Sequence, residues 1–263
     1  MALWSHRLIL DHASIGREES SPLSGKRADI SVILPYWERG DALVASLAAF
    51  AARYSENGPA LELVIADDGS PTEPAAEALL NLDGRYPFPI RLVQLPRKDL
   101  PKNPSVPINR AVAASSGSAL FLSSPECRHD QAVLGEALAA HIAGGWKSII
   151  VCAVHDEVSD RWFSHSLHAP NRYHFANLIS RQQFDEVGGF DEDYRDGYCF
   201  DDPDFVERLE LAEVIWIDPD DQIVRHTVTP SKKSKQMPNK RELWIRNRDL
   251  FRAKWGRDPE GTF

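Results

Sequence analysis

The chain has 263 residues, of which 43% are hydrophobic and 26% charged, so it is long enough to bury a full core as one large α/β domain. Its net charge of −9 argues against general nucleic-acid binding, and its three cysteines are too few and too scattered for a disulfide framework or a zinc site. No apolar run approaches the roughly 20 residues of a membrane span, and the first ten residues lack a cleavage-site pattern, which predicts a cytoplasmic protein.

The first half of the chain alternates short apolar runs with segments of helical periodicity, after a polar stretch at 11–28 that is typical of a linker. The predicted strands are 30–35, 61–66, 90–95 and 120–122, and the predicted helices are 41–54, 74–81 and 107–115. This alternation predicts a mostly parallel sheet flanked by helices. Ligands of such sheets bind beyond the carboxyl ends of the strands, so Pro35 to Glu38, Asp67-Asp68 and Ser123 to Glu126 should face one crevice.

The second half is less regular and contains no internal repeat. Its predicted elements are helices at 130–143, 181–187 and 243–255 and strands at 148–154, 214–217 and 223–224, with no clear period over 155–175. Residues 232–257 carry ten Lys or Arg and two acidic residues, a local charge of +8 that leaves −17 for the rest. This basic tail could close over a diphosphate, contact an anionic membrane surface, or form a solvated helix.

An acidic stretch runs from Asp191 to Phe205, after the pair Gly188-Gly189. Bulky apolar residues flank part of it, so Asp201 or Asp202 is expected to lie against a wall rather than in free solvent. A partly desolvated carboxylate beside a reacting hydroxyl can act as a general base. The alternative interpretation is a solvated acidic loop at a helix start, with Asp202 or Asp204 as a cap.

Several motifs in this order resemble the inverting family-two glycosyltransferases of the GT-A fold. The first strand with Pro35-Tyr36-Trp37-Glu38 is similar to the family's opening strand, and 62–70, ending in Asp67-Asp68-Gly69-Ser70, is similar to its second strand. The other matching segments are 109–111 with Gly117, Gly188 to Glu192, Asp201-Asp202 and 247–256. Where the family has Asp-x-Asp, this chain has Ser124-Pro125-Glu126, so Glu126 takes the place of the metal-binding aspartate and Ser124 replaces the first one.

The resemblance implies one GT-A catalytic domain over 1–263, with a nucleotide-binding half (29–126), an acceptor-binding half (127–230) and a basic C-terminal tail and helix (231–263). It implies Asp202 as the base with Asp201 beside it, and Glu126 with His226 as ligands of Mn²⁺ or Mg²⁺. The residues that it implies for donor binding are Pro35, Tyr36, Glu38, Asp67, Asp68, Asn109 and Ser124.

The function implied is transfer of a sugar from a nucleotide-diphosphate donor, taken as a UDP-sugar, to a saccharide or lipid-linked saccharide in cell-surface polysaccharide biosynthesis. The enzyme would work in the cytoplasm, at the inner face of the membrane if Lys232, Lys233 and Lys235 contact lipid. Two alternatives remain: a catalytically silent nucleotide-sugar-binding module, which the serine at 124 suggests, and a sugar nucleotidyltransferase. Against the latter, no Gly-rich loop with Lys and Arg follows the first strand.

Overall fold

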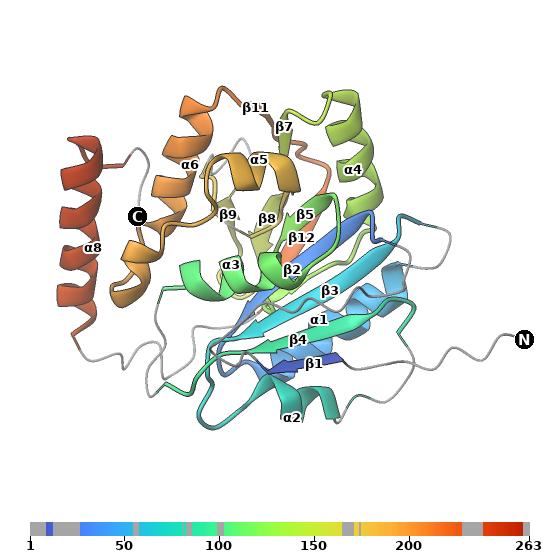
Figure 1. The fold of residues 1–263 in the computed structure, drawn as a ribbon. Coiled ribbons are helices and arrows are strands. Elements are labelled where there is room, and N and C mark those ends of the chain that lie inside the picture. The colour runs from blue at the N-terminus through green and yellow to red at the C-terminus, as the bar shows by residue number, and fades with distance from the viewer. Residues whose placement is uncertain are drawn as a thin grey trace, which may run out of the picture.

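An eight-stranded sheet forms the centre of the computed structural model, which describes residues 9–12, 27–54, 58–80, 82, 86–98, 103–164, 171–173, 175–227 and 239–259 (Figure 1). The strands are, in spatial order, β1 (Ile9–His12), β4 (Ile90–Gln94), β3 (Leu61–Asp67), β2 (Ile30–Tyr36), β5 (Ala119–Leu122), β10 (Asn177–Ser180), β7 (Ser148–Val151) and β11 (Ile215–Ile217). Only β10 runs antiparallel to its neighbours. The predicted fold class, a mostly parallel sheet flanked by helices, is confirmed.

Helices cover both faces of this sheet because its central strands are apolar on both sides. One face packs against α1 (Gly40–Arg53), α2 (Ala75–Leu80) and α4 (Val133–Ala143). The other packs against α3 (Ser105–Ala114), α5 (Arg181–Glu186) and α6 (Asp201–Leu211). In β2 the alternation is explicit, since Val32 and Leu34 face the first group of helices and Ile33 faces the second.

A smaller sheet extends the fold beside the carboxyl-terminal half of the main one. Its order is β6 (Cys127–Arg128), β12 (Ile223–His226), β8 (Ala153–Asp156) and β9 (Arg161–Ser164). The single strand predicted at 148–154 is therefore two strands, because the chain passes from one sheet to the other at Cys152. The strand β9 lies within 155–175, where the sequence showed no clear period.

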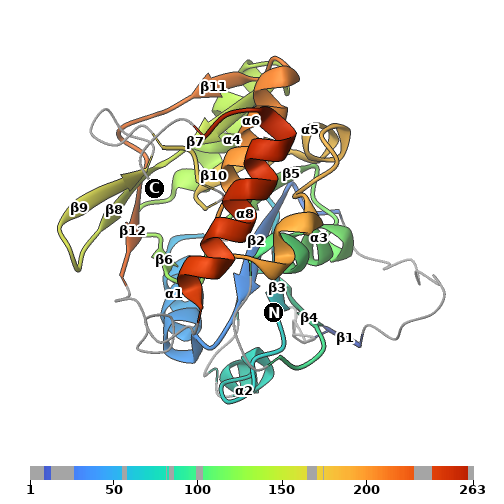
Figure 2. The ribbon, with the colours of Figure 1, turned by 90° about the vertical axis from the view of Figure 1, so that its left-hand side faces the viewer.

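The acidic stretch is more ordered than a loop. It contains the 3₁₀ helix η1 (Glu192–Asp196), and α6 begins within it at Asp201. The last helix, α8 (Lys240–Trp255), lies beside η1 and α6 (Figure 2). Phe251 of α8 is buried together with Tyr194 and Phe200, and this aromatic cluster attaches the C-terminal helix to the acidic stretch. The lysines at 232, 233 and 235, on which the tail interpretations rest, lie outside the described residues.

A buried histidine should make the stability of this fold depend on pH. His129 packs against Phe50 and Phe121, its Nδ1 lies 2.6 Å from the hydroxyl of Tyr54, and burial lowers its pKa to about 3. The unfolded chain binds a proton at this position below about pH 6.5, whereas the folded chain stays neutral down to about pH 3. The contribution of neutral His129 to stability is therefore complete above pH 6.5, and protonation of the unfolded chain removes about 1.4 kcal/mol per pH unit below it.

Urea unfolding between pH 7.5 and 5.0 checks this expectation. Gln cannot take up a proton. His129→Gln should therefore lower the slope of the unfolding free energy against pH by about 1.4 kcal/mol per pH unit, the value for one proton. Tyr54→Phe is the matched control, because it removes the hydroxyl partner and leaves the imidazole in place. Equal slopes for wild type and His129→Gln would show that another group governs the pH dependence.

Candidate functional site

Three neighbouring parallel strands bring the predicted donor residues to one edge of the sheet, except Asn109, which lies on α3. Tyr36 at the end of β2 pairs in register with Asp67 at the end of β3, and Ile33 pairs with Leu122 at the end of β5. Because the strands are parallel, the segments that follow them begin at the same edge. Asp68, Glu38 and the turn at 123–126 therefore emerge side by side, as the sequence predicted.

The two aspartates after β3 have different environments. Asp67 accepts hydrogen bonds from the backbone N–H groups of Gly69 (3.1 Å), Ser70 (2.9 Å) and Ala75 (2.9 Å), so its carboxylate fixes the turn and the start of α2. The Asp68 carboxylate is also buried but forms an ion pair with Lys98, in the segment that follows β4. Of the pair, Asp68 is the one whose carboxylate meets a side chain that can move away for a ligand.

The residues at the end of β2 bind the backbone of neighbouring segments. Tyr36 is 1% exposed, its hydroxyl donates to the carbonyl of Glu73 (2.5 Å), and its own carbonyl accepts from the N–H of Asp68 (2.9 Å). The Glu38 carboxylate accepts hydrogen bonds from the N–H groups of Thr72 (2.7 Å) and Glu73 (2.8 Å). Tyr36 and Glu38 thus fix the shape of this edge of the sheet, next to the half-buried Pro35.

The turn after β5 presents Glu126. The hydroxyl of Ser124 accepts a hydrogen bond from the N–H of Glu126 (3.2 Å), so the serine stabilises the turn by a contact that needs no charge. The Glu126 side chain then pairs with Arg39, at the start of α1. Its other carboxylate oxygen, Oε2, lies 3.2 Å from Nε2 of His226.

The small sheet explains why His226 reaches this turn from 100 positions away. In the register, His226 lies opposite both Cys127, which follows Glu126, and Asp156 of β8. Nδ1 of His226 lies 2.7 Å from Oδ1 of Asp156, and its Nε2 faces Glu126. One imidazole is therefore held between two carboxylates.

The charges at this centre support one another. Burial opposes ionisation of Glu126, but the hydrogen bond with His226 and the charge of Arg39 outweigh it and lower the pKa of Glu126. Burial likewise opposes protonation of His226, but its contacts with Glu126 and Asp156 raise the pKa of His226 above its ordinary value. Asp156 also accepts from the N–H of Ser159 at 2.8 Å, and despite burial its pKa is lowered.

The Glu126–His226 pair fits a divalent cation. Two ligand atoms about 2.1 Å from one octahedral ion are separated by about 3 Å, close to the 3.2 Å between Oε2 and Nε2. A carboxylate on the far ring nitrogen, as Asp156 provides, is the usual way to orient a metal-binding histidine. Within the described part of the chain no three acidic, His or Cys side chains form a complete metal site. Two protein ligands are nevertheless sufficient where substrate phosphates and water supply the rest.

The acidic pair begins helix α6. Asp201 is 2% exposed, and its Oδ1 accepts a hydrogen bond from the side-chain amide of Asn103 (2.6 Å). Asp202 is half-buried and lines a small cavity together with Arg172, Tyr173 and Asn177. Burial, with the nearby Asp202 carboxylate, raises the pKa of Tyr173. Of the two aspartates, Asp202 is the one that a substrate could contact.

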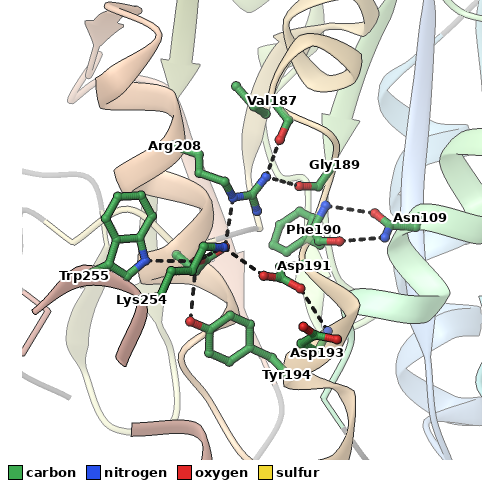
Figure 3. A network of polar contacts seen from close by, with 11 residues as sticks. Asn109, Val187, Gly189, Phe190, Asp191, Asp193, Tyr194, Arg208, Lys254 and Trp255 are labelled. Carbon is green, nitrogen blue, oxygen red and sulfur yellow. Dashed lines mark hydrogen bonds and ion pairs between the residues drawn. The ribbon is translucent and has the colours of Figure 1, made fainter. Parts of the chain in front are cut away.

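Polar contacts with other parts of the protein hold the segment before α6 in place (Figure 3). The amide of Asn109 accepts from the N–H of Phe190 (2.9 Å) and donates to its carbonyl (2.8 Å), so this side chain is engaged by the protein itself. Lys254 of α8 contacts Asp191 (2.8 Å) and the buried Asp204 (2.7 Å). Asp204 also accepts from the side chains of Arg208 and Trp255. Asp204 therefore joins α6 to α8, which is a structural role.

Sequence reasoning missed four side chains at this edge: Arg39, Lys98, Asn103 and Asp156. Arg39 and Lys98 follow the ends of predicted strands, and that position could have identified them. Asn103 and Asp156 had no local signal, because their partners Asp201 and His226 lie 98 and 70 residues away.

The chain matches a known family over more than half of its length. Residues 31–194 fit the family model described as Glycosyl transferase family 2. No curated protein sequence matches the chain. The part of the chain that matches the model contains Asp68, Glu126 and the first four residues of the acidic stretch, and it ends before Asp201-Asp202 and His226.

Solved structures share the fold at low sequence identity. S. aureus TarS 1–349 in complex with UDP-GlcNAc has a TM-score of 0.66 at 15% identity, covering 86% of this chain and 66% of that one. The mannosyltransferase PcManGT from Pyrobaculum calidifontis, in complex with GDP-Man and Mn²⁺, has a TM-score of 0.63 at 16% identity, covering 89% and 66%. A further S. aureus TarS structure gives 0.58 at 16% identity, covering 77% of this chain and only 37% of that one.

These neighbours agree with the family match in fold. This chain spans 66% of the length of the first two and only 37% of the further TarS structure. Along the chain, β2, β3 and β5 are followed by the turn that carries Glu126 and by the helix that begins with Asp201-Asp202, which is the order of the motifs. The chain is therefore a glycosyltransferase domain that belongs to glycosyl transferase family 2.

Proposed function

We propose that this domain transfers a sugar, with inversion, from a UDP-sugar to a hydroxyl of a saccharide or lipid-linked saccharide in cell-surface polysaccharide biosynthesis. The observation that carries the proposal is the Glu126–His226–Asp156 centre, which lies at the edge where Asp68 emerges and fits a cation. A nucleotide-diphosphate donor needs a group that binds its base and a charge that binds its diphosphate, and the two must lie no farther apart than the length of the nucleotide.

The donor would be recognised at Asp68 and its surroundings. The buried Asp68 carboxylate can accept a hydrogen bond from the imide N–H of uracil once Lys98 turns toward the phosphates. Asp67 and Glu38 would then contribute by holding the backbone turns beside the uridine. Pro35 and Tyr36 would form the floor of the uridine site. Asn109 and Ser124 would contribute indirectly, since their side chains bind the backbone of Phe190 and of Glu126.

The leaving group would be held at Glu126 and His226. A divalent cation bound there would neutralise the charge that develops on the departing UDP. Asp156 keeps the imidazole oriented so that Nε2 faces the site, and Arg39 adds a fixed positive charge beside Glu126. Mixed carboxylate and imidazole ligands favour Mn²⁺ somewhat over Mg²⁺.

The acceptor would be activated by Asp202. Its carboxylate takes the proton of the acceptor hydroxyl as that oxygen bonds to the anomeric carbon, and the bond from this carbon to the diphosphate breaks in the same step. A single displacement inverts the anomeric centre and needs one base. The cavity beside Asp202 also contains Asn177, whose side-chain oxygen is buried without a hydrogen-bond partner among the described residues.

Asp68→Ala should weaken UDP binding about 10-fold or more and leave the fold intact. A hydrogen bond to a charged group contributes roughly 1.5–3 kcal/mol, which corresponds to about 10- to 150-fold in affinity. Calorimetric titration with UDP measures the effect. Asp68→Asn separates the charge from the shape of the side chain and should give a smaller loss. Unchanged affinity in folded Asp68→Ala would remove uracil recognition from this residue.

Calorimetry with UDP, with and without Mn²⁺, followed by assay of UDP release from several sugar donors, tests the function as a whole. UDP binding that Mn²⁺ strengthens and acceptor-dependent UDP release are expected. Binding without release from any donor would indicate a silent binding module, and pyrophosphate release from a nucleoside triphosphate would indicate a nucleotidyltransferase.

Whether the domain meets its acceptor at a membrane is a separate question. No helix in the part of the chain that the structure describes is long and apolar enough to cross a membrane. An attachment of the domain to anionic lipid through the basic tail remains part of the proposal.

A further inference from the structure

The backbone just before α6 has an unusual conformation. Cys199 and Phe200 both have positive φ angles, 60° and 75°, in the left-handed region that non-glycine residues rarely occupy. Two such residues in succession persist only where surrounding contacts hold them. The chain then enters α6 directly at Asp201-Asp202, so the direction of the proposed base depends on this pair.

Two asparagine side chains hold this turn by binding the same carbonyl. Asn103, just before α3, and Asn247, on α8, both donate a hydrogen bond from Nδ2 to the carbonyl of Cys199, at 3.3 and 2.9 Å. We call these two residues the carboxamide clamp. Asn247 is fully buried, and a Cβ placed on Gly197 would lie 2.0 Å from its side-chain oxygen, so it has no room to move.

Asn103 makes a further contact that Asn247 does not. Its Nδ2 also donates to Oδ1 of Asp201 at 2.6 Å, while its own Oδ1 accepts from the N–H of Ser105 at 3.0 Å. Both side chains of the Asn103–Asp201 pair are at most 3% exposed. Asn103 follows the segment that contains Lys98, so it links the region after β4 to the start of α6.

We propose that Asn103 is a positioning residue of the transfer reaction, which fixes Asp202 by holding Asp201 and the Cys199–Phe200 turn. The catalytic part of this inference rests on the proposed function, with Asp202 as the base. The chemistry of the contact requires an amide at 103. Its oxygen faces a backbone donor and its nitrogen faces two acceptors, one of them a carboxylate.

Asn103→Asp separates this role from a merely structural one. The substitution keeps the size and an oxygen that can accept from the N–H of Ser105, since a carboxylate oxygen accepts as an amide oxygen does. It removes both donated hydrogen bonds and places a second carboxylate against Asp201. We expect kcat to fall at least about 10-fold with UDP affinity changed less than about twofold, and amide hydrogen exchange at 200–209 to become at least about 10-fold faster.

The reciprocal exchange provides the rescue. In the double variant N103D/D201N the donor and acceptor of the pair are reversed, so the hydrogen bond between the two side chains can form again. Both kcat and exchange protection at 200–209 should return to within about threefold of wild type. As a control, Gln131→Glu adds the same charge at an exposed position and keeps an oxygen that can accept from the N–H of Ile223, so it should change neither quantity. Asn103→Ala, which adds no charge, replaces Asn103→Asp if the latter does not fold.

The outcomes distinguish the inference from the proposed function. Unchanged exchange at 200–209 in Asn103→Asp would show that the clamp does not hold α6. Faster exchange with unchanged kcat, or a double variant that restores neither quantity, would overturn the positioning role. If the wild type transferred sugar from no donor, the proposed function would fail, and hydrogen exchange alone would still decide whether the clamp exists.

Discussion

Asp202→Asn should bind UDP with wild-type affinity and transfer sugar at least about 100-fold more slowly. General-base removal costs about 10²- to 10⁴-fold in rate, and an amide of the same size cannot take the acceptor proton. Asp202 lies in the first turn of α6 and lines the cavity beside Tyr173, whereas the adjacent Asp201 is buried against Asn103. Initial rates at saturating donor, together with UDP titration, measure the two quantities separately. The acid side of the pH–rate profile should also flatten.

Two comparison variants make this result specific. Asp201→Asn keeps an oxygen that can accept from Asn103, so it should lose much less activity than Asp202→Asn. Glu207→Gln removes an acid from the same helix, at a side chain paired with Arg257, and should have little effect. Near-normal turnover of Asp202→Asn with an inactive Asp201→Asn would mean that the base is the other member of the pair. If both variants were active, the base would lie outside this stretch.

Glu126→Gln should raise the Mn²⁺ concentration needed for tight UDP binding by more than about 100-fold. The loss of an outer contact to a metal ligand typically costs 10- to 100-fold in metal affinity, and the loss of a ligand charge should cost more. Asp156→Asn, which weakens only the orientation of His226, should therefore fall in the range of about 10- to 100-fold. Calorimetric UDP titrations at a series of Mn²⁺ concentrations give both values without any turnover.

Glu157→Gln is the matched control for this series. Glu157 follows Asp156 directly, but its carboxylate pairs with Arg128 and does not face His226. Its Mn²⁺ dependence should equal that of the wild type. Full activity of enzyme treated with EDTA would contradict the cation site, and Arg39 would then be the nearest fixed charge for the diphosphate.

The sequence by itself determined the four neighbouring strands β4, β3, β2 and β5 of the central sheet and the edge at which they end, but it did not predict β1 or β10. The β-branched runs that became β2 and β3 are buried almost throughout, and each ends at a proline or an aspartate pair that the strand pattern located to within two residues. Parallel pairing then places those ends together whatever the rest of the chain does, because strands joined by helical crossovers must run in the same direction. The placement of Asp68 and Glu126 at one edge of the sheet could therefore be predicted without a structure.

Only the tertiary structure decided how the site is completed. Asp156 reaches His226 through a small sheet of strands two to four residues long, which are too short to show a period. Asn103 meets Asp201, and Lys254 meets Asp204, across 98 and 50 positions. Hydrogen bonds of this kind leave no local pattern, since each partner is only one polar residue among many until the chain folds. The carboxylates of the acidic stretch differ in role for the same reason: burial and contacts, rather than spacing, leave Asp202 at the cavity and commit Asp201 and Asp204 to holding its helix.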